Sequence, residues 1–152
     1  MSKLKLFAKY WLPVLIWMIV IFSASGDRGS VRHSSRIIEP IVRWLFPHVQ
    51  DETVRAVVYY VRKTAHVTEY AILAILLWRA LVKPVRGQAR TWSWKTVGVV
   101  LLAAFLYAAS DEFHQSFVPN REGRPMDVLI DTFGGALGLL ALWGLGRWRK
   151  WW

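Results

Sequence analysis

Cysteine is absent from the sequence, and this absence excludes several kinds of chemistry at once. Without a thiol, the chain can form no disulfide, no thiolate nucleophile and no cysteine-ligated zinc site. Acidic residues are also few, ten against twenty lysines and arginines, which gives a formal charge of +10. The sequence shows no internal repeat and no low-complexity tract, so it does not indicate a repeat architecture.

Charged residues make up only 20% of the chain, whereas apolar residues make up 55% and gather in four long runs. Such runs are typical of a small polytopic membrane protein, whose main partner is the lipid bilayer. A soluble basic protein that binds nucleic acid would not carry them, so we expect no nucleic-acid partner. The sequence predicts one all-α domain over residues 1–152. It should be a bundle of four transmembrane helices, at about residues 6–23, 64–82, 94–110 and 126–146.

The first apolar run, Tyr10 to Phe22, follows three lysines and precedes the small residues Ser23 to Gly26. This order resembles a secretory signal peptide with its cleavage site. Counted from Leu6, however, about 17 residues are largely apolar, which is the lower bound for a membrane span. We interpret the run as a retained helix, with cleavage as the alternative.

A polar interval of residues 26–62 separates the first two apolar runs. Within it, apolar residues recur at helical spacing from Ile37 to Phe46, opposite Arg36, Glu39 and Arg43. This pattern predicts a short amphipathic helix in the membrane interface, which Pro47 should end. A lid packed on the ends of the other helices is the alternative, because periodicity does not identify the neighbour of the apolar face.

The charges predict which side of the membrane each loop occupies. The N-terminal tail, the connection between the second and third runs, and the C-terminal tail carry eleven lysines and arginines and no acid. All ten acids and all four histidines fall in the other segments. Positive loops remain inside, so both termini should face the cytoplasm of a bacterial membrane. Most tryptophans would then form a belt at the inner interface.

Polar residues therefore meet at the outer ends of the second, third and fourth predicted spans. In the second span they lie three or four residues apart and share one helix face. The catalytic candidates are His66, Glu69, Asp111 and His114. The ligand-binding candidates are Lys63, Tyr70, Glu112, Gln115, Arg121, Asp127 and Asp131. Gly134 and Gly138 follow at a spacing that lets two helices approach closely.

Two segments, KTAHVTEYAILAILL and SDEFHQSFVPNREGRPMDVLIDTFGGALG, resemble the VanZ-like family of bacterial membrane proteins. The family pattern combines Lys-x-x-His-x-x-x-Tyr, Asp-Glu-x-x-Gln, Pro-x-Arg and a late acidic pair before Gly-x-x-x-Gly. Asp131 stands where many relatives have asparagine. The resemblance extends from Trp11 to Gly146 and implies an integral membrane protein of the cell envelope, linked to resistance against teicoplanin-type glycopeptide antibiotics. It implies no established reaction.

The residues themselves are compatible with three functions. A catalytic site could use a histidine as general base near neutral pH. A divalent cation could bind among the histidines and acids, although the spacing matches no metal signature and we do not favour it. A binding site could hold an anionic or lipid-linked headgroup on Lys63, Arg121 and Arg124. The third possibility is a structural clamp, in which ion pairs only hold the helix ends together. Depth argues against the clamp, because Asp131 lies about 9 Å along its helix from Pro125.

Overall fold

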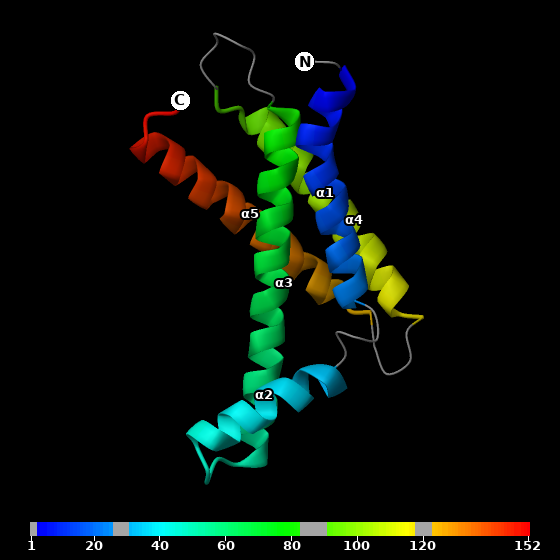
Figure 1. Cartoon of the computed structure of the whole chain (residues 1–152), viewed down its shortest axis with the longest axis vertical. Helices are drawn as coiled ribbons and strands as arrows, with labels where there is room; N and C mark the ends of the chain where they lie inside the picture. Colours follow the sequence, from blue (N-terminus) through cyan, green and yellow to red (C-terminus); the bar gives the residue numbers. More distant parts are fainter. Residues whose placement is uncertain (1–2, 26–30, 83–90, 118–122) are drawn as a thin grey trace.

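The computed structural model describes residues 3–25, 31–82, 91–117 and 123–152. These residues form five α-helices and no strand, which confirms the all-α prediction. The helices are α1 (Lys3–Ser25), α2 (Val31–Leu45), α3 (Asp51–Leu81), α4 (Trp94–Gln115) and α5 (Pro125–Trp148). The start of α1 and the end of α5 lie at one end of the bundle, and the end of α1, the end of α4 and the start of α5 lie at its other end (Figure 1).

Among the described helices, three are long and apolar enough to cross a membrane: α1 from Leu4, α4 and α5. Each has at least 22 residues, and 22 residues in a helix span about 33 Å, slightly more than the hydrocarbon core of a bilayer. The second predicted span, residues 64–82, corresponds to the C-terminal half of α3 and is not among the three. The physical reason is polarity, because His66 and Glu69 interrupt its apolar sequence.

Helix α3 is the axis of the fold and contacts all four other helices. It begins at Asp51, thirteen residues before the start of the predicted span. Its C-terminal half runs antiparallel to α1 and α4, and α5 crosses it obliquely (Figure 1). Its N-terminal half extends beyond the ends of α1, α4 and α5 and carries α2. The chain therefore consists of a bundle and a projecting pair of helices.

Two glycines of α5 produce the closest helix crossing. A Cβ atom on Gly138 would lie 2.5 Å from the carbonyl oxygen of Ala71, and one on Gly134 equally close to that of Val67. No real Cβ tolerates such a distance, so the α3 backbone fits only against glycine here. The spacing of four residues places both glycines on one face of α5, as the small-residue pattern predicts.

Tryptophans at the end of the bundle that holds Lys3 and Trp148 pack against each other rather than forming only a peripheral belt. Trp78 is 2% exposed, and its ring centroid lies 5.3 Å from that of Trp92 and 5.6 Å from that of Trp152. Trp152 thus packs against α3 at this end of the bundle. Burial of aromatic area on this scale stabilises one end of the core.

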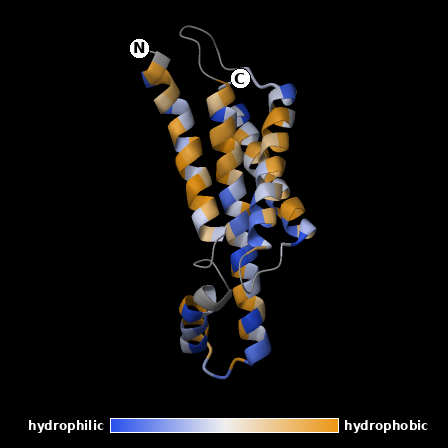
Figure 2. Cartoon of the chain, turned by 90° about the vertical axis from the view of Figure 1, so that its right-hand side faces the viewer, coloured by the Kyte–Doolittle hydropathy of each residue, from blue (hydrophilic) through white to orange (hydrophobic). Residues whose placement is uncertain are grey.

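Helix α2 packs on α3 and, among the described helices, contacts no other. It therefore does not cover the ends of α4 and α5 as a lid would. The contact buries Val54 and Val58 of α3. The opposite side of α2 leaves Ile37, Ile41 and Trp44 exposed, the last by 79%. In Figure 2, α2 and the N-terminal half of α3 lie below the apolar bundle. Helix α2 ends at Leu45, two residues before Pro47, as expected.

A charge pair fixes α2 to the start of α3. Arg43 donates hydrogen bonds to Glu39 at 3.0 Å and to Asp51 at 2.6 Å. The hydrogen bond and the charge of Arg43 hold the pKa of Asp51 below its usual range. A depressed aspartate pKa contributes stability above the ordinary pKa, and this contribution is lost as the pH falls through the lowered value.

We therefore expect α2 to loosen from α3 in acid. A spin label on Ile37→Cys, in a chain with no other cysteine, should gain mobility as the pH falls below 3.8, the ordinary aspartate value. In an Asp51→Asn background the label should be mobile at all pH values, whereas Glu52→Gln should retain the transition. A label with unchanged mobility down to strong acid would show that the pair does not hold α2.

Candidate functional site

One polar contact of the site, between two buried side chains, joins α1 to α4. The hydroxyl of Ser25 donates to Oδ2 of Asp111 at 2.5 Å, and Nε2 of Gln115 donates to the same oxygen at 2.9 Å. Ser25 and Asp111 are both 1% exposed. Gln115 is one turn after Asp111 on α4, so the helix itself aligns the amide with the carboxylate. This contact fixes the outer end of α1 on the bundle.

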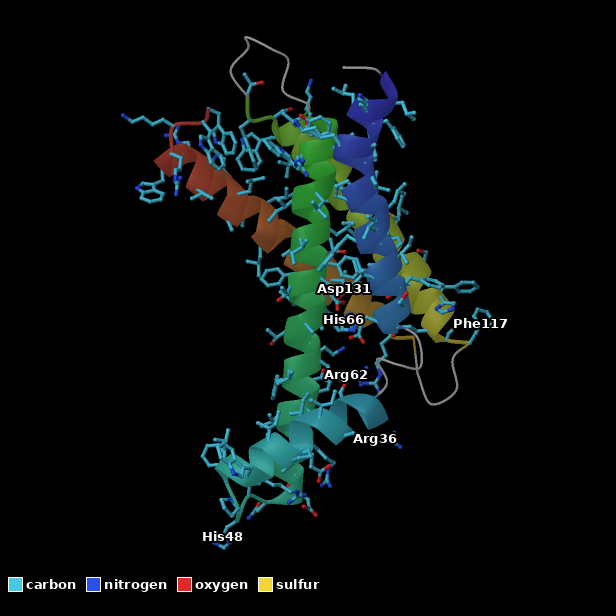
Figure 3. The ribbon with its side chains drawn as sticks, in the orientation of Figure 1. Arg36, His48, Arg62, His66, Phe117 and Asp131 are labelled. Carbon is cyan, nitrogen blue, oxygen red and sulfur yellow. The ribbon has the colours of Figure 1, made fainter. Side chains whose placement is uncertain are left out.

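Two further contacts join α3 to α5. Nζ of Lys63 forms an ion pair with Oδ1 of Asp127, and both side chains are about one-fifth exposed. One turn deeper, Nδ1 of His66 lies 3.6 Å from Oδ1 of Asp131 (Figure 3). The spacing follows because α3 and α5 run in the same general direction here: Lys63 and His66 are three apart on α3, and Asp127 and Asp131 are four apart on α5. In the inner pair His66 is 18% exposed, about as much as Lys63 and Asp127, whereas Asp131 is fully buried.

Asp131 is buried without the hydrogen bonds that a carboxylate usually has. It is 1% exposed, and neither of its oxygens accepts a hydrogen bond from the described residues. The hydroxyl of Tyr70, fully buried nearby, likewise has no hydrogen bond within the described chain. Buried polar groups are normally paired, so such atoms mark a place where a further donor is expected.

Glu112 is another buried acid of the site. Its Oε2 accepts a hydrogen bond from the backbone N–H of Arg124 at 2.9 Å, whereas its Oε1 accepts none from the described residues. Gly123 lies so close to the backbone carbonyl of Glu112 that a Cβ atom would overlap it. The glycine thus lets the segment before α5 descend onto the end of α4.

The four carboxylates form one electrostatic group. Asp131 interacts with Glu112, Asp111 and Asp127, and Lys63 opposes them. Among the described side chains of this group, four acids face the one lysine, Lys63, and His66 adds a positive charge only when it is protonated. A charge excess of this kind inside a bundle is costly, so it requires protons, a cation or a donor-rich ligand.

The structure brings together eight of the predicted residues at the end of the bundle where α1 and α4 end and α5 begins: Lys63, His66, Tyr70, Asp111, Glu112, Gln115, Asp127 and Asp131. We call these eight residues the polar cluster. Two candidates lie elsewhere. His114 stacks on Phe22 of α1, with ring centroids 4.2 Å apart. Glu69 lies in a groove between α1 and α3. Arg121 lies outside the described residues.

Ser25 belongs to the site, although the sequence did not predict it. Its position beside small residues at the end of the first apolar run suggested a cleavage site. The order of the predicted spans could have indicated it, because the end of the first span and the end of the third span, at Asp111, lie at the same predicted membrane face.

The described residues contain no group of three histidine, aspartate or glutamate side chains placed to hold a metal ion. Asp111, Glu112 and Asp127 are each engaged by a donor from another segment, whereas Asp131 accepts no hydrogen bond from the described residues. The cluster is thus arranged for hydrogen bonding and ion pairing among several partners.

Comparison with known proteins gives one match. The family model described as VanZ/LLP1 matches residues 10–146. No curated protein and no solved structure matches the chain. The matched range contains the whole polar cluster and both glycines of the α3–α5 crossing.

Proposed function

The chain belongs to the VanZ/LLP1 family, and on this premise we propose that it is an outward-facing ligand-binding protein of the bacterial membrane. In this proposal four helices cross the membrane, with both termini in the cytoplasm. The C-terminal half of α3 is the fourth span. Two observations support this role: this half of α3 runs antiparallel to α1 and α4, and its Tyr70, Leu73 and Trp78 are buried. The acid-free positive segments would all lie on the cytoplasmic side.

Helix α2 would lie at the outer surface of the membrane. Its exposed face carries Ile37, Ile41 and Trp44, and Arg36 flanks this face. An exposed apolar strip beside basic residues is the pattern of a helix that rests in the headgroup region. This arrangement would hold the projecting part of α3 upright above the polar cluster.

We propose that the polar cluster binds an anionic ligand of the cell envelope, and that this binding underlies a contribution to glycopeptide resistance. The observation that carries the proposal is the set of buried oxygens on Asp131 and Glu112 without hydrogen bonds from the described residues, beside the partly exposed Lys63. A headgroup with phosphate or carboxylate oxygens would bind Lys63. Its hydroxyl or amide N–H groups would supply the donors that the buried carboxylates need.

A structural clamp is the second candidate, and three interhelical contacts favour it. Ser25–Asp111, Lys63–Asp127 and His66–Asp131 each join two helices. In this case the cluster would only hold the outer ends of the bundle together, and no ligand would be needed.

Binding of inorganic diphosphate to the purified protein tests the first candidate. We expect diphosphate to raise the melting temperature of the wild type. We also expect Lys63→Gln to weaken this binding about tenfold or more, because a hydrogen bond to a charged group contributes about 1.5 to 3 kcal/mol. Lys95→Gln, at the opposite end of the bundle, is the matched control and should bind as the wild type does. Equal binding by both variants would contradict the assignment of the anion to the cluster.

A further inference from the structure

A groove runs along the face of α3 that points away from the polar cluster. Its cavity volume is about 620 Å³, and its walls are Trp17 of α1 and a stripe of α3 from Val57 to Ile72. Thr68 of this stripe follows His66 by two residues, which places it about 200° around the helix. The groove is therefore a separate feature from the polar cluster.

The polar atoms along this groove are already engaged within the protein. The hydroxyl of Thr64 donates to the carbonyl of Tyr60 at 2.9 Å, and that of Thr68 donates to the carbonyl of Thr64 at 2.8 Å. The indole N–H of Trp17 donates to the backbone carbonyl of Glu69 at 2.8 Å. Glu69, the one acidic residue among the described walls, is partly buried and also engaged within the protein. The walls therefore offer methyl groups and aromatic rings, which suit hydrocarbon rather than a polar ligand.

The length and position of the groove identify the kind of hydrocarbon. From Val57 to Ile72 the stripe is about 22 Å long, more than the roughly 15 Å of half a bilayer core. Trp17 lies eight residues, or about 12 Å, before the outer end of α1. Val57 lies six residues, or about 9 Å, outside Lys63. The groove thus begins within the membrane and continues beyond the outer ends of the bundle.

The groove is continuous with the lipid-facing surface of a candidate membrane span. Ile16 and Val20 of α1, which flank Trp17 in sequence, are 51% and 43% exposed, and Tyr60 and Val61 of α3 are also exposed. A lipid chain in the bilayer therefore has direct access to the groove along apolar surface. We propose that this groove binds one hydrocarbon chain of an outer-leaflet lipid and raises part of it above the membrane. The proposal does not depend on a ligand in the polar cluster.

Photolabelling in vesicles tests this site. The protein would be reconstituted in phosphatidylcholine and phosphatidylglycerol with a trace of phosphatidylcholine that carries a diazirine at the end of one acyl chain. After irradiation, mass spectrometry locates the adducts. We expect Tyr60, Thr64 and Thr68 to be labelled at least about fivefold more than Val99 and Leu102, which are comparably exposed on α4, because groove walls bury several methylene groups of a bound chain.

Groove-filling variants sharpen the test. Ala65→Trp should lower labelling of the groove about fivefold and leave labelling of α4 unchanged, because the ring takes the space of the chain. Val99→Trp is the control on α4 and should leave the groove labelled. Equal labelling of the groove and α4 in the wild type would overturn the proposal, whatever the variants do. Disulfide-linked dimers of Thr68→Cys that exclude the lipid label would also overturn it, and would assign the groove to a second copy of the chain.

Discussion

Replacing Gly138 with alanine is expected to destabilise the bundle, whereas the same change at Gly144 in the same helix is not. At Gly138 the new Cβ would lie 2.5 Å from the carbonyl oxygen of Ala71 and 2.8 Å from its Cα. Both are backbone atoms, so relief requires α3 and α5 to separate along their whole crossing. Overpacking of this kind costs about 1 to 3 kcal/mol. At Gly144 nothing lies within 4 Å of the new atom, and alanine favours the helix by up to about 1 kcal/mol.

Thermal unfolding in detergent measures this difference. The Gly138→Ala variant should melt well below the wild type, and Gly144→Ala at or above it. Gly134→Ala should behave as Gly138→Ala does, because its Cβ would meet the Val67 backbone. Equal melting of the Gly138 and Gly144 variants would show that α3 and α5 do not cross at these glycines.

The site could be predicted from the sequence to the extent that it depends on helix ends. Apolar length fixes where α1, α4 and α5 turn around, and charge asymmetry assigns their polar ends to one side. The contacts of Lys63 with Asp127 and of His66 with Asp131 follow once α3 and α5 run in the same direction from this polar end. The glycine spacing at Gly134 and Gly138 also predicted their close packing correctly.

The remaining features depend on packing that periodicity does not determine. Glu69 and His66 are three residues apart, so their directions differ by about 60° around α3. The position of α1 then places Glu69 in the groove, while His66 faces α5. The sequence analysis predicted only the part of α3 from about residue 64 as a membrane span and did not predict the helix before it, because the prediction followed apolarity rather than helix signals. Asp51 and Glu52 in the first turn complement the helix dipole, and they were the available signal.

The ion pair of Lys63 and Asp127 separates the two candidate functions, because its two halves can be removed singly or together. In a clamp, Lys63→Gln or Asp127→Asn alone leaves one partly buried charge without its partner, which costs up to about 3 to 5 kcal/mol. Removing both restores a neutral pair of similar shape, so stability should return. If the clamp is the whole function, resistance should return with it.

In a ligand site the double variant should behave differently. We expect Lys63→Gln with Asp127→Asn to melt within about 1 kcal/mol of the wild type, since two neutral amide side chains replace the ion pair. We expect it to lose the resistance phenotype, because the cation that binds the anionic headgroup is gone. The measurements are melting temperature in detergent and teicoplanin susceptibility, in a bacterial host where the wild-type chain raises the inhibitory concentration. An ion pair outside the polar cluster, removed by Arg43→Gln with Asp51→Asn at the contact of α2 with α3, is the matched control and should keep resistance. Recovery of both stability and resistance in the Lys63–Asp127 double variant would assign the polar cluster to the clamp and remove it from ligand binding.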